Sequence, residues 1–385
     1  MVKAVRSGLS LRAVAARFGV SPATVHRWVA RAKGRRLNRV DFEGRTPGRA
    51  ANCTPPEIEE RILALRVSLR EISVLGEFGA GAIRAVLEAE APGRTPPSRA
   101  TIHRVLTRHG VLDASKRHRR PAPPKGWHLP EVAAGKAELD TFDFIEGLKL
   151  ERGPLLEVLT ATSLHGSLSD AWMMTRATAK DTLEAILSRW RREGLPDYAQ
   201  FDNATLFQGA HQFKDSVGRV IRACLALGVT PVFAPPREPG FQNAIEGFNG
   251  LWQAKVWRRF HFKDLPALEA ASARYVAAHR AKTAPRRDRA PARRPFPVGF
   301  RLDLHAPLAG TLVFIRRTDD RGQVHLLGRT FPICPQWTHR LVRCEVSFDH
   351  QRIRFHALRR RDPAAQPLLR ETAYERPDRP FQGHP

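Results

Sequence analysis

The spacing of apolar residues between positions 133 and 284 changes repeatedly from strand-like to helix-like. Short apolar or alternating runs, such as ELDTFDFI, LLEVLTATSL and LSDAWMMTRA, are typical of strands. Helical spacing follows in TAKDTLEAILSRWRREG and returns after each of two further short strands. Three strands followed by alternating helices and strands predict an α/β domain with a mixed sheet.

The first 40 residues predict a helix-turn-helix, with Gly19 in the turn. Ser21 can cap the second helix, and Pro22 fits its first position because no N–H is needed there. Val25 then faces inward, and the opposite side of this helix would enter the major groove of DNA. A plain helical hairpin is the alternative. The chain begins so close to this unit that we expect little room for an earlier helix.

A second unit in residues 52–114 repeats the plan and predicts another helix-turn-helix, similar to a winged helix. Ser98 is its cap, while Ile102 and Val105 face inward. The outward positions of the two recognition helices are the candidate DNA contacts, namely Ser21, Thr24, His26, Arg27, Arg31, Arg99, Thr101, His103 and Arg104.

Two stretches rich in proline and arginine, residues 115–132 and 285–302, predict basic linkers on either side of the α/β core at 133–284. Residues 303–360 contain short alternating runs and turn signals that predict a small β-barrel. The polar, proline-rich residues 361–385 predict a disordered tail.

The net charge of the chain is strongly positive. Its 385 residues include 64 Lys+Arg against 38 Asp+Glu, a net charge of +26 and a pI near 11.2. Such an excess favours a polyanionic partner, although a proteome biased toward arginine would also raise the count. DNA is favoured over a membrane because there is no long apolar span and no signal-peptide pattern. Four cysteines without a C-x-x-C pair are typical of reduced thiols in the cytoplasm.

Three acids occupy positions where sites form in mixed sheets. Asp140 lies within a strand, Asp202 directly follows one, and Glu246 is in the first turns of a helix. Each has an ordinary alternative as a surface, turn or helix-start acid. Together, three carboxylates would suit Mg²⁺, which prefers oxygen ligands and is often shared with phosphate. Asp143 is an odd number of residues from Asp140, so the two must face opposite sides of the strand.

Three segments, AELDTFDF, AQFDNATLFQG and PPREPGFQNAIEGFNGLWQAKVW, resemble DDE transposases and retroviral-type integrases, specifically bacterial insertion-sequence transposases with an integrase catalytic core. The resemblance covers roughly residues 5–360. It implies an RNase H-like core, two Mg²⁺ or Mn²⁺ ions, cleavage at transposon ends and strand transfer into target DNA. Carried over by motif, the catalytic and metal-binding triad is Asp140, Asp202 and Glu246, which leaves Asp143 as a partner for an arginine.

The resemblance also implies partners and further contacts. The C-terminal barrel would be SH3-like, and Lys255, Arg258 and Arg259 would bind donor DNA. The partners would be double-stranded terminal repeats and target DNA, bound by a homo-oligomer near the bacterial nucleoid. Two alternatives stay open, an inactive domesticated transposase that only binds DNA and a nuclease that cuts RNA hybrids.

Overall fold

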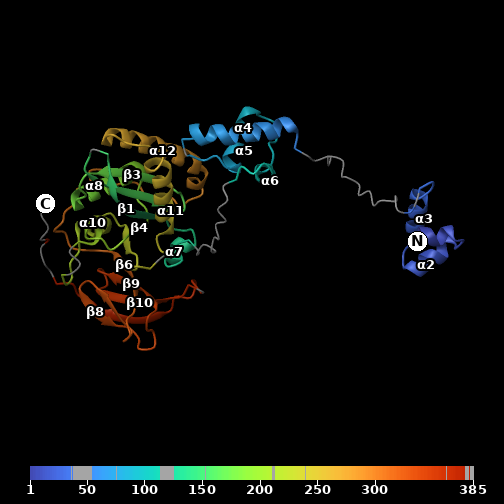
Figure 1. Cartoon of the computed structure of the whole chain (residues 1–385). Helices are drawn as coiled ribbons and strands as arrows, with labels where there is room; N and C mark the ends of the chain where they lie inside the picture. The colour runs from blue at the N-terminus through green and yellow to red at the C-terminus, as the bar shows by residue number, and fades with distance from the viewer. Residues whose placement is uncertain are drawn as a thin grey trace.

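The computed structural model describes residues 1–35, 37, 54–74, 76–112, 125–151, 153–209, 213–238, 240–360, 362–377 and 381. Its helices and strands form two small helical units and one large α/β body (Figure 1). Within the described part, no helix is long and apolar enough to cross a membrane.

The first helical unit contains three short helices around a small apolar core. They are α1 Val2–Arg6, α2 Leu11–Phe18 and α3 Pro22–Arg31. Ser10 and Ser21 cap α2 and α3, because each side chain accepts a hydrogen bond from the backbone N–H three residues later. The structure therefore confirms the two helices of the predicted helix-turn-helix, α2 and α3. Helix α1 is a short helix of five residues before Ser10, where the sequence left little room for one.

The second helical unit has its own core, formed by α4 Pro56–Ile72, α5 Ala80–Glu90 and α6 Arg99–Arg108. Ser98 caps α6 as expected. Residues 54–74 and 76–112 contain no strand, so the described part of this unit shows three helices without a wing.

One nine-stranded sheet forms the centre of the α/β body, in the order β11-β10-β9-β6-β5-β4-β1-β2-β3. The three strands β1, β2 and β3 are antiparallel neighbours, whereas β1, β4, β5 and β6 run parallel. The strands are β1 Leu139–Lys149, β2 Leu155–Ser163, β3 Ser169–Met174, β4 Tyr198–Phe201, β5 Thr230–Phe233, β6 Thr311–Arg317, β9 Leu341–Ser347, β10 Arg352–Leu358 and β11 Leu368–Ala373.

Helices cover both faces of this sheet, which separates the core into two main layers. Helices α8 and α10 pack on one face, and α11 and α12 pack on the other (Figure 1). The helices of the body are α7 Pro130–Ala133, α8 Ala179–Glu193, α9 Thr205–Gln208, α10 Arg219–Ala226, α11 Asn243–Trp252, a π-helical extension η2 Gln253–Trp257 and α12 Leu265–Arg287. The mixed α/β class predicted from the apolar pattern is confirmed.

The C-terminal part differs from the expected separate barrel. Strand β6 pairs in parallel with β5, with Val313 opposite Val232, and so continues the sheet of the core. A hairpin of β7 Gln323–Leu326 and β8 Arg329–Pro332 packs against this extension. The SH3-like barrel is not confirmed. Strand β11, which pairs with β10, lies inside the expected disordered tail and corrects that prediction for residues 368–373.

The two expected linkers also carry structure where they are described. Trp127, His128 and Leu129 are buried against the core, although they fall within the predicted linker 115–132. Its residues 115–124 lie outside the described part of the chain. Helix α12 continues to Arg287, and the side chain of Arg293 reaches an acid in the core. Buried apolar side chains such as Trp127 and Leu129 and the ion pair of Arg293 with Asp140 thus order these segments, although their proline and arginine content predicts linkers.

Candidate active site

Strand β1 places its two aspartates on opposite faces of the sheet, as their odd separation requires. Asp140 faces α8 and Asp143 faces α11. In the parallel pairing of β1 with β4, Asp140 lies opposite Ala199. Three residues further along both strands, Asp143 comes level with Asp202, which directly follows β4. The register therefore brings Asp143, and not Asp140, to the end of the strand where Asp202 lies.

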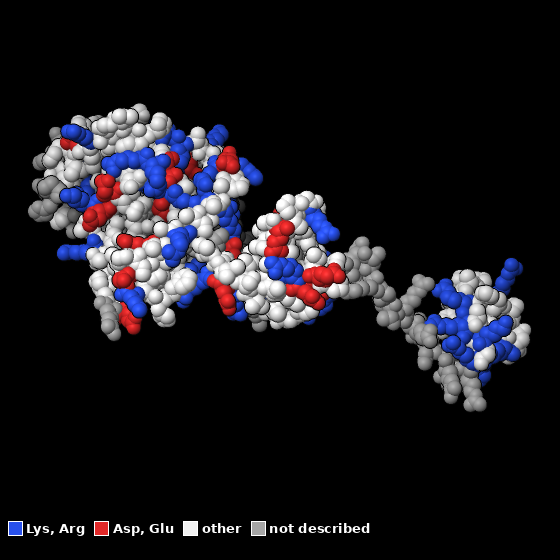
Figure 2. Space-filling model, turned by 90° about the horizontal axis from the view of Figure 1, so that it is seen from above, with Lys and Arg blue, Asp and Glu red and all other residues white. Residues whose placement is uncertain are grey.

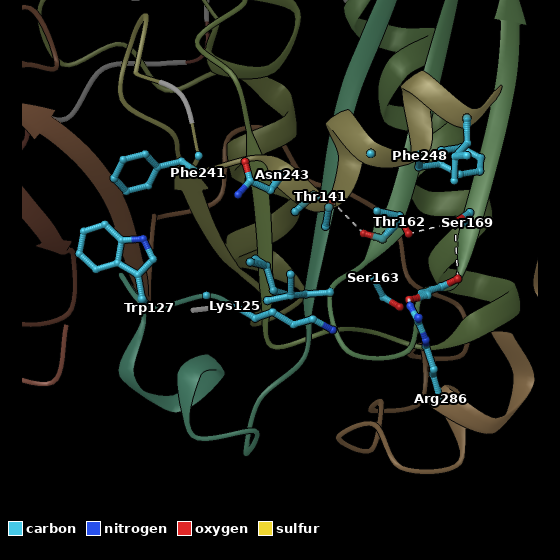
Figure 3. Close-up of a pocket in the computed structure, with 18 of the residues that line it drawn as sticks. Lys125, Trp127, Thr141, Thr162, Ser163, Ser169, Phe241, Asn243, Phe248 and Arg286 are labelled. Carbon is cyan, nitrogen blue, oxygen red and sulfur yellow. Dashed lines mark hydrogen bonds between the residues drawn. The ribbon is translucent and has the colours of Figure 1, made fainter. Parts of the chain in front are cut away.

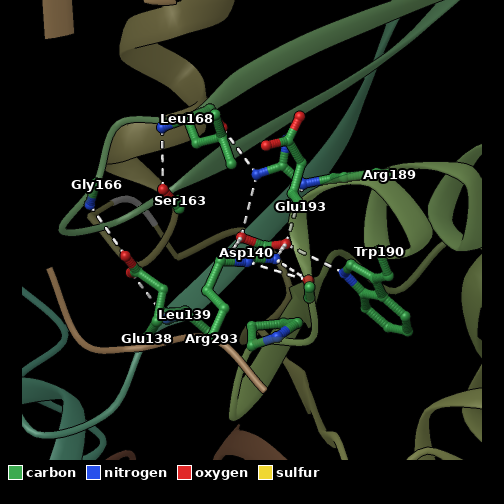
Figure 4. A network of polar contacts seen from close by, with 12 residues as sticks. Glu138, Leu139, Asp140, Ser163, Gly166, Leu168, Arg189, Trp190, Glu193 and Arg293 are labelled. Carbon is green, nitrogen blue, oxygen red and sulfur yellow. Dashed lines mark hydrogen bonds and ion pairs between the residues drawn. The ribbon is translucent and has the colours of Figure 1, made fainter. Parts of the chain in front are cut away.

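Asp140 is fully buried and enclosed by cationic and N–H donors (Figure 4). The two terminal guanidinium nitrogens of Arg293 donate to its carboxylate at 2.8 and 2.9 Å, and Arg189 donates at 3.0 and 3.2 Å. The indole N–H of Trp190 adds a fifth bond at 3.1 Å. Burial alone would raise the pKa of Asp140, but the two arginines hold it well below its usual range.

The pairs around Asp140 extend into a network that joins distant elements. Arg189 also donates to Asp170 on β3, and Asp170 accepts from Arg192 and Arg280 at 2.9 and 2.6 Å. Because these groups saturate the oxygens of Asp140, its carboxylate has no free lone pair directed at a ligand. The structure therefore does not bring Asp140 together with Asp202 and Glu246, which corrects the predicted grouping of the three acids.

Asp143 has different surroundings on the other face of β1. It is half-buried and accepts a hydrogen bond of 2.8 Å from the side-chain amide of Asn249. The amide oxygen of Asn249 in turn accepts from the Thr160 hydroxyl at 2.6 Å, which fixes the orientation of the amide. Asn249 follows Glu246 by three residues, so both lie on the same side of α11.

The pKa of Asp143 indicates that the acids of this face are close together. Burial and the negative charges of Asp202 and Glu246 raise the pKa of Asp143 to about 6. Burial also raises the pKa of Asp202. An arginine partner for Asp143, as the resemblance implied, is replaced by the neutral Asn249. The acids whose charges act on Asp143 are thus Asp202, after the end of β4, and Glu246 on α11.

A second set of contacts fixes the loop that carries Asp202. Its carboxylate accepts from the backbone N–H of Ala204 at 3.0 Å. The neighbouring Asn203 donates to Ala234 O at 2.7 Å and accepts from Arg316 at 2.9 Å. Arg316 comes from β6, so the C-terminal extension of the sheet contributes directly to the architecture of this site.

An open hollow of about 490 Å³ lies beside the acids and is lined by both Asp202 and Glu246. No group of three or more His, Cys, Asp or Glu side chains is arranged to hold a metal ion in the part of the chain that the structure describes. The chemistry of the three acids nevertheless fits a divalent cation, because they are hard oxygen ligands, and burial together with the charges of Asp202 and Glu246 raises the pKa of Asp143.

Asp143, Asn249 and Arg316 were not predicted as site residues. The odd separation of Asp140 and Asp143 correctly placed them on opposite faces of β1. It could not show which of the two faces also carries Asp202 and Glu246. An asparagine three residues after Glu246 on an otherwise apolar helix was the available signal for Asn249. Nothing local indicates Arg316, because its contact with Asn203 spans 113 residues.

The outward positions of the two recognition helices are where the sequence predicted them. His26 and Arg27 on α3 are exposed, as are Arg99, His103 and Arg104 on α6. The hydroxyls of Thr24 and Thr101 are engaged by the capping serines Ser21 and Ser98. Arg31 lies over the ring of Trp28. The first unit carries no Asp or Glu in residues 1–35, and Figure 2 shows its visible face crowded with Lys and Arg.

The basic residues after Glu246 hold the second helical unit against the core. Lys255 donates to Gly76 O at 2.7 Å. Arg259 donates to Ser73 O at 2.5 Å and to Glu71 O at 2.7 Å, at the C-terminal end of α4. These two side chains therefore bind carbonyl groups of the chain itself, which differs from the predicted contact with DNA. Arg258 remains exposed.

The first helical unit matches the family model for a homeodomain-like domain over residues 1–39. A larger part of the chain is similar to a chain of a simian T-cell lymphotropic virus intasome in complex with PP2A regulatory subunit B56 gamma. That match has 14% identity and a TM-score of 0.34, and it covers 72% of this chain and 88% of the other.

Two integrase catalytic cores match a smaller part of the chain. The BIV integrase core has 17% identity and a TM-score of 0.28, covering 36% of this chain and 81% of its own. The HTLV-2 integrase core in complex with magnesium has 13% identity and a TM-score of 0.28, covering 41% and 87%. At these TM-scores the chain is similar to retroviral integrases only at a low level, and its membership of their family does not follow.

Proposed function

We propose that this protein is a DNA transposase of the DDE type, which cleaves DNA at transposon ends and transfers the strand into target DNA. The observation that carries the proposal is the open hollow lined by both Asp202 and Glu246, beside which the strand register brings Asp143 level with Asp202, in a chain whose first 39 residues match a homeodomain-like model. Asp143 takes the place that the sequence resemblance gave to Asp140.

The order of the first five strands supports this proposal independently of any comparison. Strands β3, β2, β1, β4 and β5 are neighbours, and only β2 runs opposite to the other four. This is the arrangement expected of an RNase H-like core. Asp202 directly follows the carboxyl end of β4, where open α/β sheets build their sites, and the register brings Asp143 of β1 level with it.

The three carboxylates would hold Mg²⁺ or Mn²⁺, which supplies Lewis-acid stabilisation of a phosphoryl transfer and a more acidic bound water or hydroxyl. Asp143 is oriented for this task by the amide of Asn249. Asp202 is positioned through its own backbone turn and through Asn203, which Arg316 holds. The raised pKa of Asp143 means that a proton competes for this carboxylate near pH 6.

DNA recognition is assigned to the two capped helices α3 and α6. Their exposed basic and polar side chains, including Arg27 and Arg104, present donors suited to phosphates and base edges. A chain of net charge +26 adds a sequence-independent attraction to DNA. One core has a single acid site and an element has two ends, so the proposal includes a homo-oligomer on DNA.

The decisive experiment measures strand cleavage on labelled duplexes made from the DNA that flanks the gene on either side, where the proposal expects inverted repeats, with Mn²⁺ present. Asp143→Asn, Asp202→Asn and Glu246→Gln should each reduce cleavage by at least about 10³-fold, because each removes a ligand to the ions. Glu146→Gln is the matched control, since Glu146 is an exposed acid on the same strand. Equal cleavage by Asp143→Asn and wild type would exclude the proposed triad.

One observation favours a second function, a non-catalytic DNA-binding protein. In the described residues the acids do not form a group arranged to hold a metal ion. If wild type and Asp202→Asn bind the repeats equally and neither cleaves them with Mg²⁺ or Mn²⁺, this second function replaces the first.

A further inference from the structure

The segment between β5 and α11 forms one side of the hollow that contains Asp202 and Glu246. Of the described residues that line this hollow, only Arg237 is a Lys or Arg, whereas Asp202, Glu238 and Glu246 are acids. Arg237 is exposed, and its side chain makes no hydrogen bond or ion pair with another described residue. One cation in the hollow is therefore available to a ligand.

The backbone of Arg237 has a left-handed conformation, with a φ of +57°. Residues other than glycine adopt this conformation only at a cost in free energy, because their Cβ atom comes too close to the following carbonyl oxygen. Three residues later the chain uses glycine for a positive φ, at Gly240. Strained backbone of this kind is concentrated at functional sites. The strain at Arg237 is therefore a second observation that indicates a use for its side chain.

Glu238 holds this segment against the C-terminal extension of the sheet. Its carboxylate forms ion pairs with Arg317 on β6 at 2.7 Å and with Arg360, which follows β10, at 2.9 Å. Arg360 also lies over the ring of Phe241, 5.6 Å from its centroid, so one side chain contacts the segment at two points. The two ion pairs neutralise Glu238 and restrict the backbone next to Arg237.

Both ends of the segment are anchored as well. Asn203 donates to Ala234 O at 2.7 Å, and Gln200 donates to Phe241 O at 2.8 Å. The ring of Phe241 packs beside Trp127, with 5.4 Å between the ring centroids (Figure 3). The segment is therefore held at its beginning, in its middle and at its end, which fixes its strained residue beside the acids.

A phosphate that enters the hollow meets the negative charge of the acids. Asp202 and Glu246 line the hollow, and the strand register brings Asp143 level with Asp202. The charge of Glu238 is already compensated by its two arginines, so Arg237 is the group that can offset the repulsion of a phosphate. A guanidinium group suits this task, because its planar N–H groups match two oxygens of a phosphate.

We propose that Arg237 binds a backbone phosphate of the DNA strand that occupies the acidic hollow, and that Glu238 is the positioning residue that keeps Arg237 in place. This inference rests on the proposed action on DNA, because it names the side chain that holds the strand beside the acids. It does not require that the acids cleave the strand. Measurements of binding and of cleavage therefore test the two proposals separately.

Arg237→Gly is the most informative variant, because glycine removes the side chain and also suits the left-handed backbone. The full chain is titrated with a labelled blunt-ended duplex in the absence of divalent cations, so that no cleavage occurs. Binding should be about 3- to 10-fold weaker at physiological ionic strength, and the slope of log affinity against log salt should be smaller by about 0.9. The thermal midpoint of the variant should be no lower than that of wild type.

Two control variants separate the side chain of Arg237 from its backbone and from the net charge. Gln351 is exposed and also has a positive φ, of +48°, so Gln351→Gly relieves similar strain without removing a cation. Arg274→Ala removes an exposed cation of α12 that does not line the hollow. Neither control should reproduce the weaker binding or the smaller salt slope.

A double variant tests the role of Glu238. Glu238→Gln removes a negative charge, which by itself would favour DNA, but it also weakens both ion pairs that hold the segment. We expect this variant to bind the duplex more weakly than wild type. In Arg237→Gly the same change should cause no further loss, since Glu238 acts through Arg237. Glu146→Gln, which removes an exposed acid from β1, should not weaken binding.

Three results would overturn the proposal: unchanged affinity and salt slope in Arg237→Gly, a lower thermal midpoint of that variant, or an equal loss from Glu238→Gln in both backgrounds. Failure of the proposed function gives a different result. If wild type does not cleave DNA with Mn²⁺ but Arg237→Gly still binds more weakly, the contact of Arg237 with DNA stands and catalysis is excluded. Cleavage by wild type together with full affinity in Arg237→Gly retains the function and excludes the contact.

Discussion

Asp140 and Asp143 are three residues apart on one strand, yet their surroundings have opposite charge. Asp140 is enclosed by two guanidinium groups and an indole N–H, and its pKa is held far below the ordinary value. Asp143 meets a neutral amide and two further acids, and its pKa rises to about 6. The ion pairs of Asp140 stabilise the fold. The ionised carboxylate of Asp143 lowers the free energy of unfolding, and a bound cation would reverse that loss.

The largest effect should come from removing the cation that Asp140 requires. Arg189→Met leaves the buried carboxylates of Asp140 and Asp170 partly uncompensated, so we expect a loss of about 3–5 kcal/mol in the free energy of unfolding. Urea denaturation measures it. Arg191→Met is the control, because its pair with Glu184 is exposed and should contribute at most about 1 kcal/mol. Similar losses in both variants would remove the contrast between the two aspartates.

Neutralising the other aspartate should act in the opposite direction. Asp143→Asn is expected to raise the free energy of unfolding by about 1–3 kcal/mol at pH 7 without metal. The folded-state pKa is raised, so the native state binds more protons than the unfolded state between about pH 4 and 6, and stability falls as pH rises through that window. The gain should therefore disappear below about pH 4. Denaturation curves at pH 4 and pH 7 test the sign, and a loss of stability at pH 7 would contradict it.

A divalent cation should produce a smaller stabilisation at the same place. At a concentration 10-fold above its dissociation constant, Mn²⁺ should stabilise wild type by about 1.4 kcal/mol. The shift in thermal midpoint should shrink as pH falls through 6, because the proton competes for Asp143. Glu246→Gln should remove the shift and Glu146→Gln should not. A shift that is equal in both variants would place the ion elsewhere.

The smallest effect concerns the docking of the second helical unit. Arg259→Ala removes hydrogen bonds to Ser73 O and Glu71 O and should cost about 1 kcal/mol of local stability. Hydrogen exchange at the C-terminal end of α4 should accelerate severalfold. Arg258→Ala should leave this exchange unchanged, because Arg258 is exposed and its side chain donates to Gln253 on η2, which is not part of the second helical unit. Equal acceleration in both would show that charge alone holds the unit.

The sequence predicted most local elements, because caps, turns and apolar spacing are local signals. The capped starts of α3 and α6 and the first five strands of the body are examples. It did not predict contacts between segments far apart in the chain. The surroundings of Asp140 and Asp143 could not be predicted for this reason, since Arg293 lies 153 residues from Asp140 and Asn249 lies 106 residues from Asp143.

The same limit explains the missed continuation of the sheet. The alternation in β9 and β10 predicts half-buried strands but does not specify their neighbours. Pairing of Val232 with Val313 decides that these strands extend the core instead of closing a barrel. Similarly, Trp127 and Leu129 are apolar anchors within a stretch whose composition otherwise indicates a linker.

The pairing of β5 with β6 has a consequence for the order in which the protein can be completed on the ribosome. Strand β5 is synthesised long before β6, and elongation at about 5–20 residues per second leaves its outer edge unpaired for seconds. An uncovered parallel edge is a template for pairing with another chain. Nascent chains or truncations that end before Thr311 should therefore aggregate. This tendency should end only when β6 has been synthesised and has paired with β5.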